Sequence, residues 1–396
     1  MGSSAFLPVS YFLLVLCTWL AEAGKPIRVW NVKNFGAVGD GKTDDSKALL
    51  GAWKQACEWT GKSKILIPKE TFLVYPVVLS GPCNGRMILQ VNGVVRAPGL
   101  DKFNSDAWLE FQYINGLTLT GPGIFDGQGP AAWSQNKCKD KSKCQQLPTS
   151  LRFSFVHDAI IQGISSIDSK SKHLTFFTCK NVVVQSIKIA APADSPNTDG
   201  IYTSLSRRIQ ILRSVIATGD DCVAIGQGSY NITVAGVFCG PGHGISVGSL
   251  GKKPDEADVQ DLVVRNCTFT NTDNGVRIKT WPDRPARNSV SDITFDDIVM
   301  NEVYNPILID QQYCPHDQCS LKSPSKVRLR DITYRNIRGV STSETAVLFL
   351  CSEEVPCENV ELVNINLRFK GQGHSKSSCS NVNGVASGKQ IPAPCF

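Results

Sequence analysis

The sequence has few of the features that mark helical, metal-binding or nucleic-acid-binding proteins. Its 396 residues include only three methionines against 33 glycines, and alternating Val, Ile and Thr between Asn, Asp and Gly favour strands and turns over a helical bundle. The cysteines lack paired CxxC spacing and the five histidines are scattered, so neither a zinc site nor another cofactor is expected. No Arg-rich helix or interleaving of basic and aromatic residues occurs, which argues against a nucleic-acid partner.

Long apolar runs are also absent, apart from a short one near the N-terminus. Residues 12–20 are mostly apolar but too few for a comfortable membrane span. Ala21 and Ala23 then place small residues at the −3 and −1 positions of a cleavage site before Gly24. We therefore predict a secretory signal peptide over residues 1–23 and a mature chain of residues 24–396 without a membrane partner.

The cysteine count points to the same route. Of the 15 cysteines, Cys17 lies in the predicted signal peptide, which leaves 14 in the mature chain. An even number suits disulfide bonds in an oxidising compartment, so we expect a secreted, extracellular protein. Several cysteines are close enough in sequence to close small loops, although spacing alone leaves the connectivity open: Cys138/Cys144, Cys314/Cys319, Cys351/Cys357 and Cys379/Cys395.

The charge is modestly basic. The formal net charge is +6, and removal of residues 1–23 deletes one acidic residue and no basic one. Such an excess suits a polyanionic partner. Ordinary solubility charge is the alternative interpretation, and composition alone favours that alternative.

A repeated segment organises the chain. Each copy opens on a polar residue and continues with an alternating apolar run, a polar pair or small residues, and another apolar residue. From Asp158 to Asp292 the starts recur at intervals that stay in the twenties or close to thirty, within the range of periods that repeat architectures show. The copies begin at Asn115, Asp158, Asn181, Arg208, Asn231, Asp261, Asp292, Asp331 and Asn359.

This period predicts a solenoid. Because the copies read as strands and no amphipathic helix fits between them, we expect an all-β fold, a right-handed parallel β-helix that forms one domain over residues 24–396. Residues 44–58 are expected to form an N-terminal capping helix with Asp44 or Asp45 as N-cap and with Leu49, Trp53 and Cys57 on one face. The Ser/Gly-rich stretch from residue 371 is expected to be loose.

Unusual polar residues fall at matching places in consecutive copies. Asp220 and Asp221 follow the copy start at Arg208 by nearly the same interval at which His243 follows the next start. Asp199 lies one copy earlier, and Arg277 and Lys279 lie one copy later, each at a somewhat larger offset from its own start. We therefore expect four consecutive coils to present these side chains on one surface.

Their chemistry fits hydrolysis of an acidic polysaccharide. Carboxylates on adjacent coils repel, so one should hold a proton near neutral pH and can protonate a glycosidic oxygen. A second, ionised carboxylate can activate water, and a neighbouring Arg and Lys can bind a substrate carboxylate. Taken singly, each motif can also be interpreted as non-functional: a turn, an incidental histidine or a solvated strand face. Their alignment across four coils is what favours a functional site.

The ordered motifs Asn197-Thr-Asp-Gly, Gly219-Asp-Asp, Gly242-His-Gly and Arg277-Ile-Lys279 resemble those of polygalacturonases, glycoside hydrolase family 28. The resemblance spans nearly the whole mature chain, and the wider sequence is most similar to plant pollen-type exopolygalacturonases. It implies inverting cleavage of α-1,4-galacturonosyl linkages of pectin in the cell wall, by a monomer, in cell-wall remodelling that includes pollen.

The resemblance also implies residue roles. Asp220 would be the general acid, Asp199 and Asp221 would hold and deprotonate water, and His243 would support the acid. Substrate binding is implied for Asn197, Arg277, Lys279 and Tyr313. The family further suggests a disulfide between Cys222 and Cys239, beside the candidates Cys351/Cys357 and Cys379/Cys395. Asn231-Ile-Thr and Asn266-Cys-Thr fit the N-glycosylation pattern.

Four alternatives stay open. An endo-acting polygalacturonase would differ in whether loops such as residues 133–149 and 314–325 block one end of the cleft. A pectate lyase would act by elimination with calcium and an arginine base, and a rhamnogalacturonan hydrolase would require an alternating substrate. A non-catalytic wall-binding protein would have no need of the acid–base set.

Overall fold

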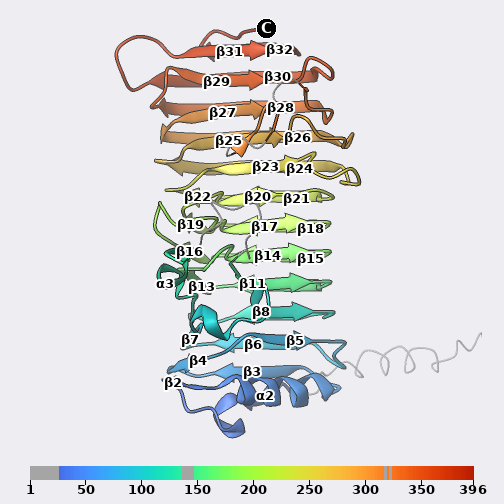
Figure 1. The fold of residues 1–396 in the computed structure, drawn as a ribbon, viewed down its shortest axis with the longest axis vertical. Coiled ribbons are helices and arrows are strands. Elements are labelled where there is room, and N and C mark those ends of the chain that lie inside the picture. The colour runs from blue at the N-terminus through green and yellow to red at the C-terminus, as the bar shows by residue number, and fades with distance from the viewer. Residues whose placement is uncertain (1–25, 136–146, 316–318, 321–322) are drawn as a thin grey trace, which may run out of the picture.

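The chain folds into a stack of parallel coils. The computed structural model describes residues 26–135, 147–315, 319–320 and 323–396. Figure 1 shows the coils piled along one axis, with helix α2 closing the N-terminal end and the C-terminus at the other. The expected parallel β-helix is therefore confirmed. The predicted signal peptide of residues 1–23 and the pair Cys138/Cys144 lie outside the described residues.

One sheet of eleven parallel strands runs the length of the stack and carries the candidate site. Its strands are β5 (Val77–Ser80), β8 (Ala107–Gln112), β11 (Thr149–Ser154), β14 (Leu174–Phe177), β17 (Ile201–Ser204), β20 (Val223–Ile225), β23 (Ile245–Leu250), β25 (Asn274–Thr280), β27 (Asn305–Asp310), β29 (Thr345–Leu350) and β31 (Lys376–Ser380).

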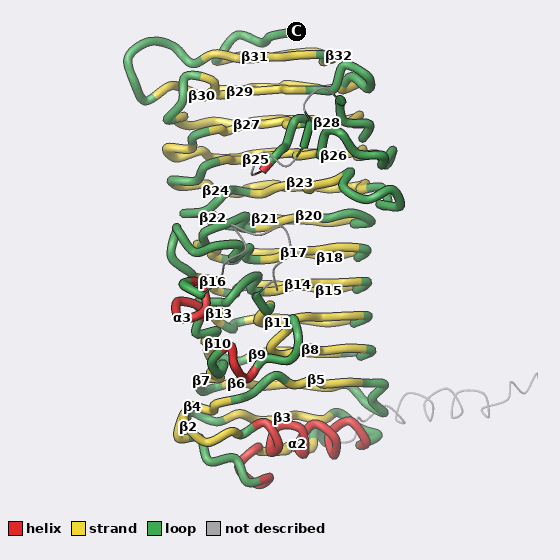
Figure 2. Tube along the Cα trace, viewed as in Figure 1, coloured by secondary structure: helices red, strands yellow, loops and turns green. Residues whose placement is uncertain are grey.

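The remaining strands of the described chain form a second, 21-stranded sheet (Figure 2). Its N-terminal members are β1 (Arg28–Asn31), β2 (Asp40–Asp44), β3 (Ser63–Ile67), β4 (Thr71–Leu73), β6 (Met87–Val91), β7 (Val94–Arg96), β9 (Leu117–Thr120), β10 (Ile124–Asp126), β12 (His157–Gln162), β13 (Ser165–Ile167), β15 (Lys180–Gln185) and β16 (Lys188–Ala190). Its later members are β18 (Arg207–Leu212), β19 (Val215–Ala217), β21 (Tyr230–Ala235), β22 (Phe238–Cys239), β24 (Val259–Thr270), β26 (Ser289–Val303), β28 (Arg328–Ser341), β30 (Cys357–Phe369) and β32 (Val382–Ile391).

The backbone conformation explains why each repeat opens on a polar residue. Asn181, Asn231 and Asp261 all lie in the left-handed region, at φ of 54°, 57° and 59°. Asn and Asp tolerate this conformation better than other residues with a side chain. Their side chains also bond between coils, since Asn231 Nδ2 donates to Asp261 Oδ2 at 2.6 Å. The repeat seen in the sequence is therefore the turn that starts each coil.

Apolar side chains fill the interior in columns. The rings of Phe111, Phe153 and Phe176 stack at centroid distances of 4.9 Å, which matches the spacing of neighbouring strands, about 4.8 Å. All three are completely buried. Because each coil repeats the inward pattern of the last, the core is continuous from one end of the solenoid to the other.

Helix α2 (Ser46–Glu58) caps the first coil as predicted. Leu49 and Trp53 are buried on its inner face. Asp45 occupies the N-cap position without a capping hydrogen bond, and its carboxylate accepts instead from the Val38 and Gly39 N–H groups. The short helical segments are η2 (Val32–Phe35), η3 (Leu100–Lys102) and α3 (Gly129–Trp133).

The expectation of a loose C-terminal stretch is wrong. Residues 376–391 form β31 and β32, which continue the two sheets. Small, half-exposed residues suffice there because the backbone hydrogen bonds of parallel pairing do not depend on side-chain size. Within the described ranges, no helix has the length and apolar content needed to cross a bilayer.

Disulfide bonds connect neighbouring turns and coils. The described pairs are Cys57–Cys83, Cys222–Cys239, Cys314–Cys319, Cys351–Cys357 and Cys379–Cys395. The first was missed in the sequence because its members are far apart along the chain, with a separation of 26. Cys179 and Cys267 are buried free thiols, so the described cysteines are not all paired.

Candidate active site

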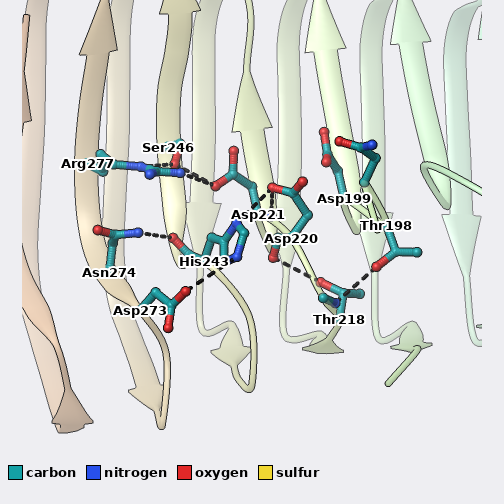
Figure 3. Close-up of polar contacts among 12 residues, drawn as sticks. Thr198, Asp199, Thr218, Asp220, Asp221, His243, Ser246, Asp273, Asn274 and Arg277 are labelled. Carbon is teal, nitrogen blue, oxygen red and sulfur yellow. Dashed lines mark hydrogen bonds and ion pairs between the residues drawn. The ribbon is translucent and has the colours of Figure 1, made fainter. Parts of the chain in front are cut away.

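The candidate site lies where four adjacent strands of the eleven-stranded sheet begin. Strands β17, β20, β23 and β25 are neighbours in that order, with Ile201, Val223, Ile245 and Val276 in register. Asp199, Asp221 and His243 each lie two residues before those register partners, on successive coils. The structure therefore has the coil order expected from the repeat, and Figure 3 shows the side chains gathered on one face.

Asp221 is the most enclosed of the three carboxylates. Its oxygens accept from Arg277 at 2.8 Å and from Lys279 at 2.7 Å, and Ser246 Oγ donates at 2.8 Å. The residue is only 2% exposed. A carboxylate buried this completely needs cations and hydrogen-bond donors beside it, and Asp221 has both.

Asp220 forms a pair with His243. His243 Nδ1 lies 3.1 Å from Asp220 Oδ1, and the other ring nitrogen, Nε2, lies 3.4 Å from Asp273 Oδ2. Burial works to raise the pKa of Asp220, but the hydrogen bond and charge of His243 outweigh it and lower that pKa to about 2. The same hydrogen bond raises the pKa of His243, so in the free protein the proton of this pair resides on the imidazole.

Asp199 has the opposite electrostatic setting. It is 7% exposed, and burial raises its pKa to about 7, with the charges of Asp220 and Asp221 adding to the effect and Lys172 opposing it. Lys172 Nζ lies 3.7 Å from Asp199 Oδ2. The sequence analysis expected the acid itself to be the carboxyl that holds its proton near neutral pH. In the free protein that carboxyl is Asp199 and not Asp220, because the hydrogen bond and charge of His243 lower the pKa of Asp220.

The turns that carry the aspartates leave no space for larger residues. A Cβ at Gly219 would lie 2.1 Å from the Ser195 carbonyl oxygen. Gly219 N–H also donates to Thr198 Oγ1 at 3.0 Å, which links the turn before Asp220 to the turn before Asp199. The disulfide Cys222–Cys239 begins directly after Asp221 and fixes the other side of this turn.

Two further predicted residues lie at the margins of the site. The Tyr313 ring faces the cations, at 5.2 Å from Lys279 Nζ and 6.0 Å from Arg277 Cζ. Asn197 is exposed, in the left-handed region at φ 53°, in the turn that leads to Asp199. The structure therefore brings Tyr313 to the cation end of the site and Asn197 to the end nearest the earlier coils.

Three polar residues were missed in the sequence: Ser246, Asp273 and Lys172. Ser246 is in register with Arg277. Lys172 lies two residues before β14, the place that Asp199 occupies before β17. When residue offsets are counted back from each strand start, and not forward from each repeat start, Lys172 aligns with Asp199.

A metal ion has candidate ligands here. Asp220, Asp221 and His243 each present an oxygen or nitrogen within 4.8 Å of one another. Arg277 and Lys279 already compensate the charge of Asp221, so a cation would have to compete with both. The two carboxylates and the imidazole are therefore better suited to holding and transferring protons than to binding a metal ion.

The two glycosylation candidates face solvent. Asn231 and Asn266 are both exposed and both lie in the left-handed region. Asn231 uses its side-chain amide to contact Asp261. Either side chain is accessible to a glycan, and occupancy stays a prediction.

Comparison with known proteins gives one family. The model for "Glycosyl hydrolases family 28" matches residues 57–389. An exopolygalacturonase from Platanus acerifolia is 46% identical over 92% of this chain and 97% of its own length. A polygalacturonase from Gossypium barbadense is 45% identical over 98% of this chain and 95% of its own.

Solved structures share the fold. An endo-xylogalacturonan hydrolase from Aspergillus tubingensis superposes with a TM-score of 0.77 at 24% identity, covering 92% of this chain and 100% of that one. A hyperthermoactive exopolygalacturonase from Thermotoga maritima gives 0.71 at 19% identity, covering 91% and 93%. At these identities the structures are evidence for the fold alone.

Proposed function

This chain belongs to glycosyl hydrolase family 28, and from that premise we propose that it is a polygalacturonase that hydrolyses α-1,4-galacturonosyl linkages of pectin with inversion. One observation carries the proposal. Asp199, Asp220 and Asp221 meet on two adjacent coils, with a histidine hydrogen-bonded to Asp220 and two cations bonded to Asp221. Acid, base and cation are then present together for an acidic sugar polymer.

The acid is the Asp220–His243 pair. The proton rests on His243 and reaches Asp220 through the Nδ1–Oδ1 hydrogen bond. When substrate displaces water from Asp220, desolvation raises the pKa of that carboxyl and favours proton transfer onto it. Asp220 then protonates the glycosidic oxygen, and His243 is left neutral.

Water is held between Asp199 and Asp221 on the opposite side. Asp221, which forms ion pairs with Arg277 and Lys279, accepts the proton as the water attacks. Asp199 shares the water and sets its position. Arg277 and Lys279 are assigned to the substrate carboxylate because both are cations that can bind an anion, and the Tyr313 ring lies beside them, 5.2 Å from Lys279 Nζ.

Exo action is the preferred mode. It is supported by the exopolygalacturonase from Platanus acerifolia, which matches this chain over 92% of its length. The candidate blocking loops, residues 133–149 and 314–325, lie partly outside the described residues. The disulfide bonds are consistent with secretion to the cell wall, and we expect the protein to act there as a monomer.

Product analysis tests the proposal. Polygalacturonate should yield new reducing ends without the ultraviolet absorbance of an unsaturated product, and galacturonate monomer should appear from the first time points. Unsaturated products would identify a lyase, and mixed oligomers would identify an endo-acting enzyme. Binding without new reducing ends would identify a wall-binding protein.

A further inference from the structure

The imidazole of His243 lies between two carboxylates, one on each neighbouring coil. Its Nδ1 lies 3.1 Å from Asp220 Oδ1, and its Nε2 lies 3.4 Å from Asp273 Oδ2 (Figure 3). The first contact belongs to the proposed acid step, and the second has no role in that step. Asp273 therefore stands beside the proton of the acid pair without an assigned function.

The backbone ladder of the solenoid continues into the turns that carry these three residues. His243 N–H donates to the Asp220 carbonyl oxygen at 2.9 Å. One coil later, Asp273 N–H donates to the Gly242 carbonyl oxygen at 2.9 Å. Asn274, which is 5% exposed, donates from its side-chain amide to the His243 carbonyl oxygen at 3.3 Å. The turns are thus held at the spacing of neighbouring strands, about 4.8 Å, which keeps the three side chains within reach of one another.

The carboxylate of Asp273 is solvated. Its side chain is 73% exposed, and among the described residues His243 is the one cationic group within ion-pair distance of it. An exposed ion pair of this kind adds little to the stability of a fold. The separation of 3.4 Å is long for a hydrogen bond, and such contacts in a free enzyme tighten when substrate binds. The contact therefore has more consequence for the proton of His243 than for folding.

The acid step requires the two ring nitrogens of His243 to behave differently. Both carry a proton before the step, and the Nδ1 proton passes to Asp220. The neutral imidazole that remains has to keep its proton on Nε2. The partner of one ring nitrogen determines which nitrogen of a neutral histidine is protonated. Because the carboxylate of Asp273 faces Nε2, it favours the imidazolium before the transfer and the Nε2–H tautomer after it.

Resting on the proposed function, we propose that Asp273 is a positioning residue of the acid pair, which holds the His243 ring with Nδ1 toward Asp220 and keeps the remaining proton on Nε2. The Nδ1–H bond breaks as the Asp220 O–H bond forms, and this proton then passes to the glycosidic oxygen. Asp273 accepts from Nε2–H and takes no proton. The proton that Asp221 removes from the attacking water is released, and one from solvent returns to Nδ1, so the cycle balances.

The charge of Asp273 also affects the pH range of the acid pair. The other charged groups that face His243 are Asp220, Asp221 and Arg277. The hydrogen bond and charge of Asp220 raise the pKa of His243 and the charge of Asp221 adds to this effect, whereas burial and Arg277 oppose it. Loss of a negative charge at 3.4 Å disfavours the imidazolium, so Asp273→Asn should lower that pKa. A fall of roughly 0.5 to 1 pH unit is expected for a solvated charge at this distance.

The first test is NMR titration of the His243 imidazole in the free protein. The chain has five histidines, and comparison with H243Q identifies the signal. D273N and D273A should lower the pKa of His243 by the stated amount, and D273E should stay near wild type. Nitrogen-15 shifts of the neutral ring should show Nε2–H in wild type and a mixture of tautomers in D273A. D194N, the same change at another exposed aspartate, should match wild type.

The second test is the pH profile of polygalacturonate cleavage. In D273N the alkaline limb of kcat/KM should move to lower pH by the same amount as the NMR titration, with KM unchanged. In D273A, kcat at the optimum should fall about twofold to tenfold, the loss that accompanies one hydrogen bond. D273N should lose less, because its amide oxygen can still accept from Nε2–H, and D273E should restore both readouts.

An unchanged His243 titration together with an unshifted pH profile in D273N and D273A would overturn the role of Asp273. A raised KM with a wild-type pH profile would overturn it as well, since Asp273 would then contact substrate and not the histidine. Absence of new reducing ends from the wild-type protein would instead overturn the proposed function, and the NMR titration would still decide whether Asp273 acts on His243.

Discussion

Asp199→Asn should stabilise the protein while it abolishes activity. Burial raises the pKa of the Asp199 carboxyl from its ordinary value of 3.8 to about 7. Between these two values the folded chain holds a proton that the unfolded chain has lost. Folded protein then binds more protons than unfolded protein, so wild-type stability falls as pH rises from about 4 to about 7 and is level above that range.

The size of the effect follows from the same pKa. At about 1.4 kcal/mol per pH unit, the difference between 3.8 and about 7 corresponds to about 4 kcal/mol of unfolding free energy. The asparagine variant has no ionised group at this place and avoids that loss. It leaves Lys172 without its ion partner, which reduces the gain, so about 2 to 4 kcal/mol of added stability is expected at pH 8.

Denaturant unfolding at pH 4 and pH 8 measures this difference. Asp199→Asn and wild type should unfold at similar free energies at pH 4, and the variant should be more stable at pH 8. Asp194→Asn, the same change at an exposed residue of the preceding loop, should show no pH-dependent difference. A variant whose advantage does not grow with pH would refute the view that Asp199 is a carboxyl destabilised by burial.

Three further substitutions test the parts of the site. Asp220→Asn removes the acid and should lower kcat by about 10²- to 10⁴-fold in a reducing-sugar assay, with the Asp194→Asn control unaffected; retained activity would exclude Asp220 as the acid. Gly219→Ala would put a Cβ 2.1 Å from a backbone oxygen and should lower kcat through displacement of Asp220, whereas wild-type kinetics would show that the turn can relax. Replacement of both Cys222 and Cys239 by alanine should lower the unfolding free energy by about 3 kcal/mol in denaturant, and an unchanged midpoint would count against this disulfide as a brace.

Much of the fold could be predicted because the solenoid repeats its constraints. Each coil needs a left-handed residue at its first turn, so Asn or Asp recurs at positions such as Asn181, Asn231 and Asp261. Coils with fewer apolar residues gave a weaker signal. The strands of residues 376–391 were missed for that reason, since their pairing depends on backbone hydrogen bonds to β29 and β30.

The candidate site was predictable in its order along the chain and less so in its electrostatics. The repeat placed Asp199, Asp220 and His243 on successive coils. It could not say which carboxyl is buried away from water and which bonds to the histidine, and those two facts separate the pKa values of Asp199 and Asp220. Lys172 was missed because the turn before β14 differs in length from the turns counted around it.

The most direct test of the central claim is the anomeric form of the first product. Proton NMR of polygalacturonate during the first turnovers, before mutarotation, distinguishes the two anomers of the released galacturonate. Attack by water held at Asp199 and Asp221, opposite the acid Asp220, predicts the β-anomer from an α-linkage. Initial release of the α-anomer would contradict the water-handling role of these two aspartates and would require a covalent intermediate.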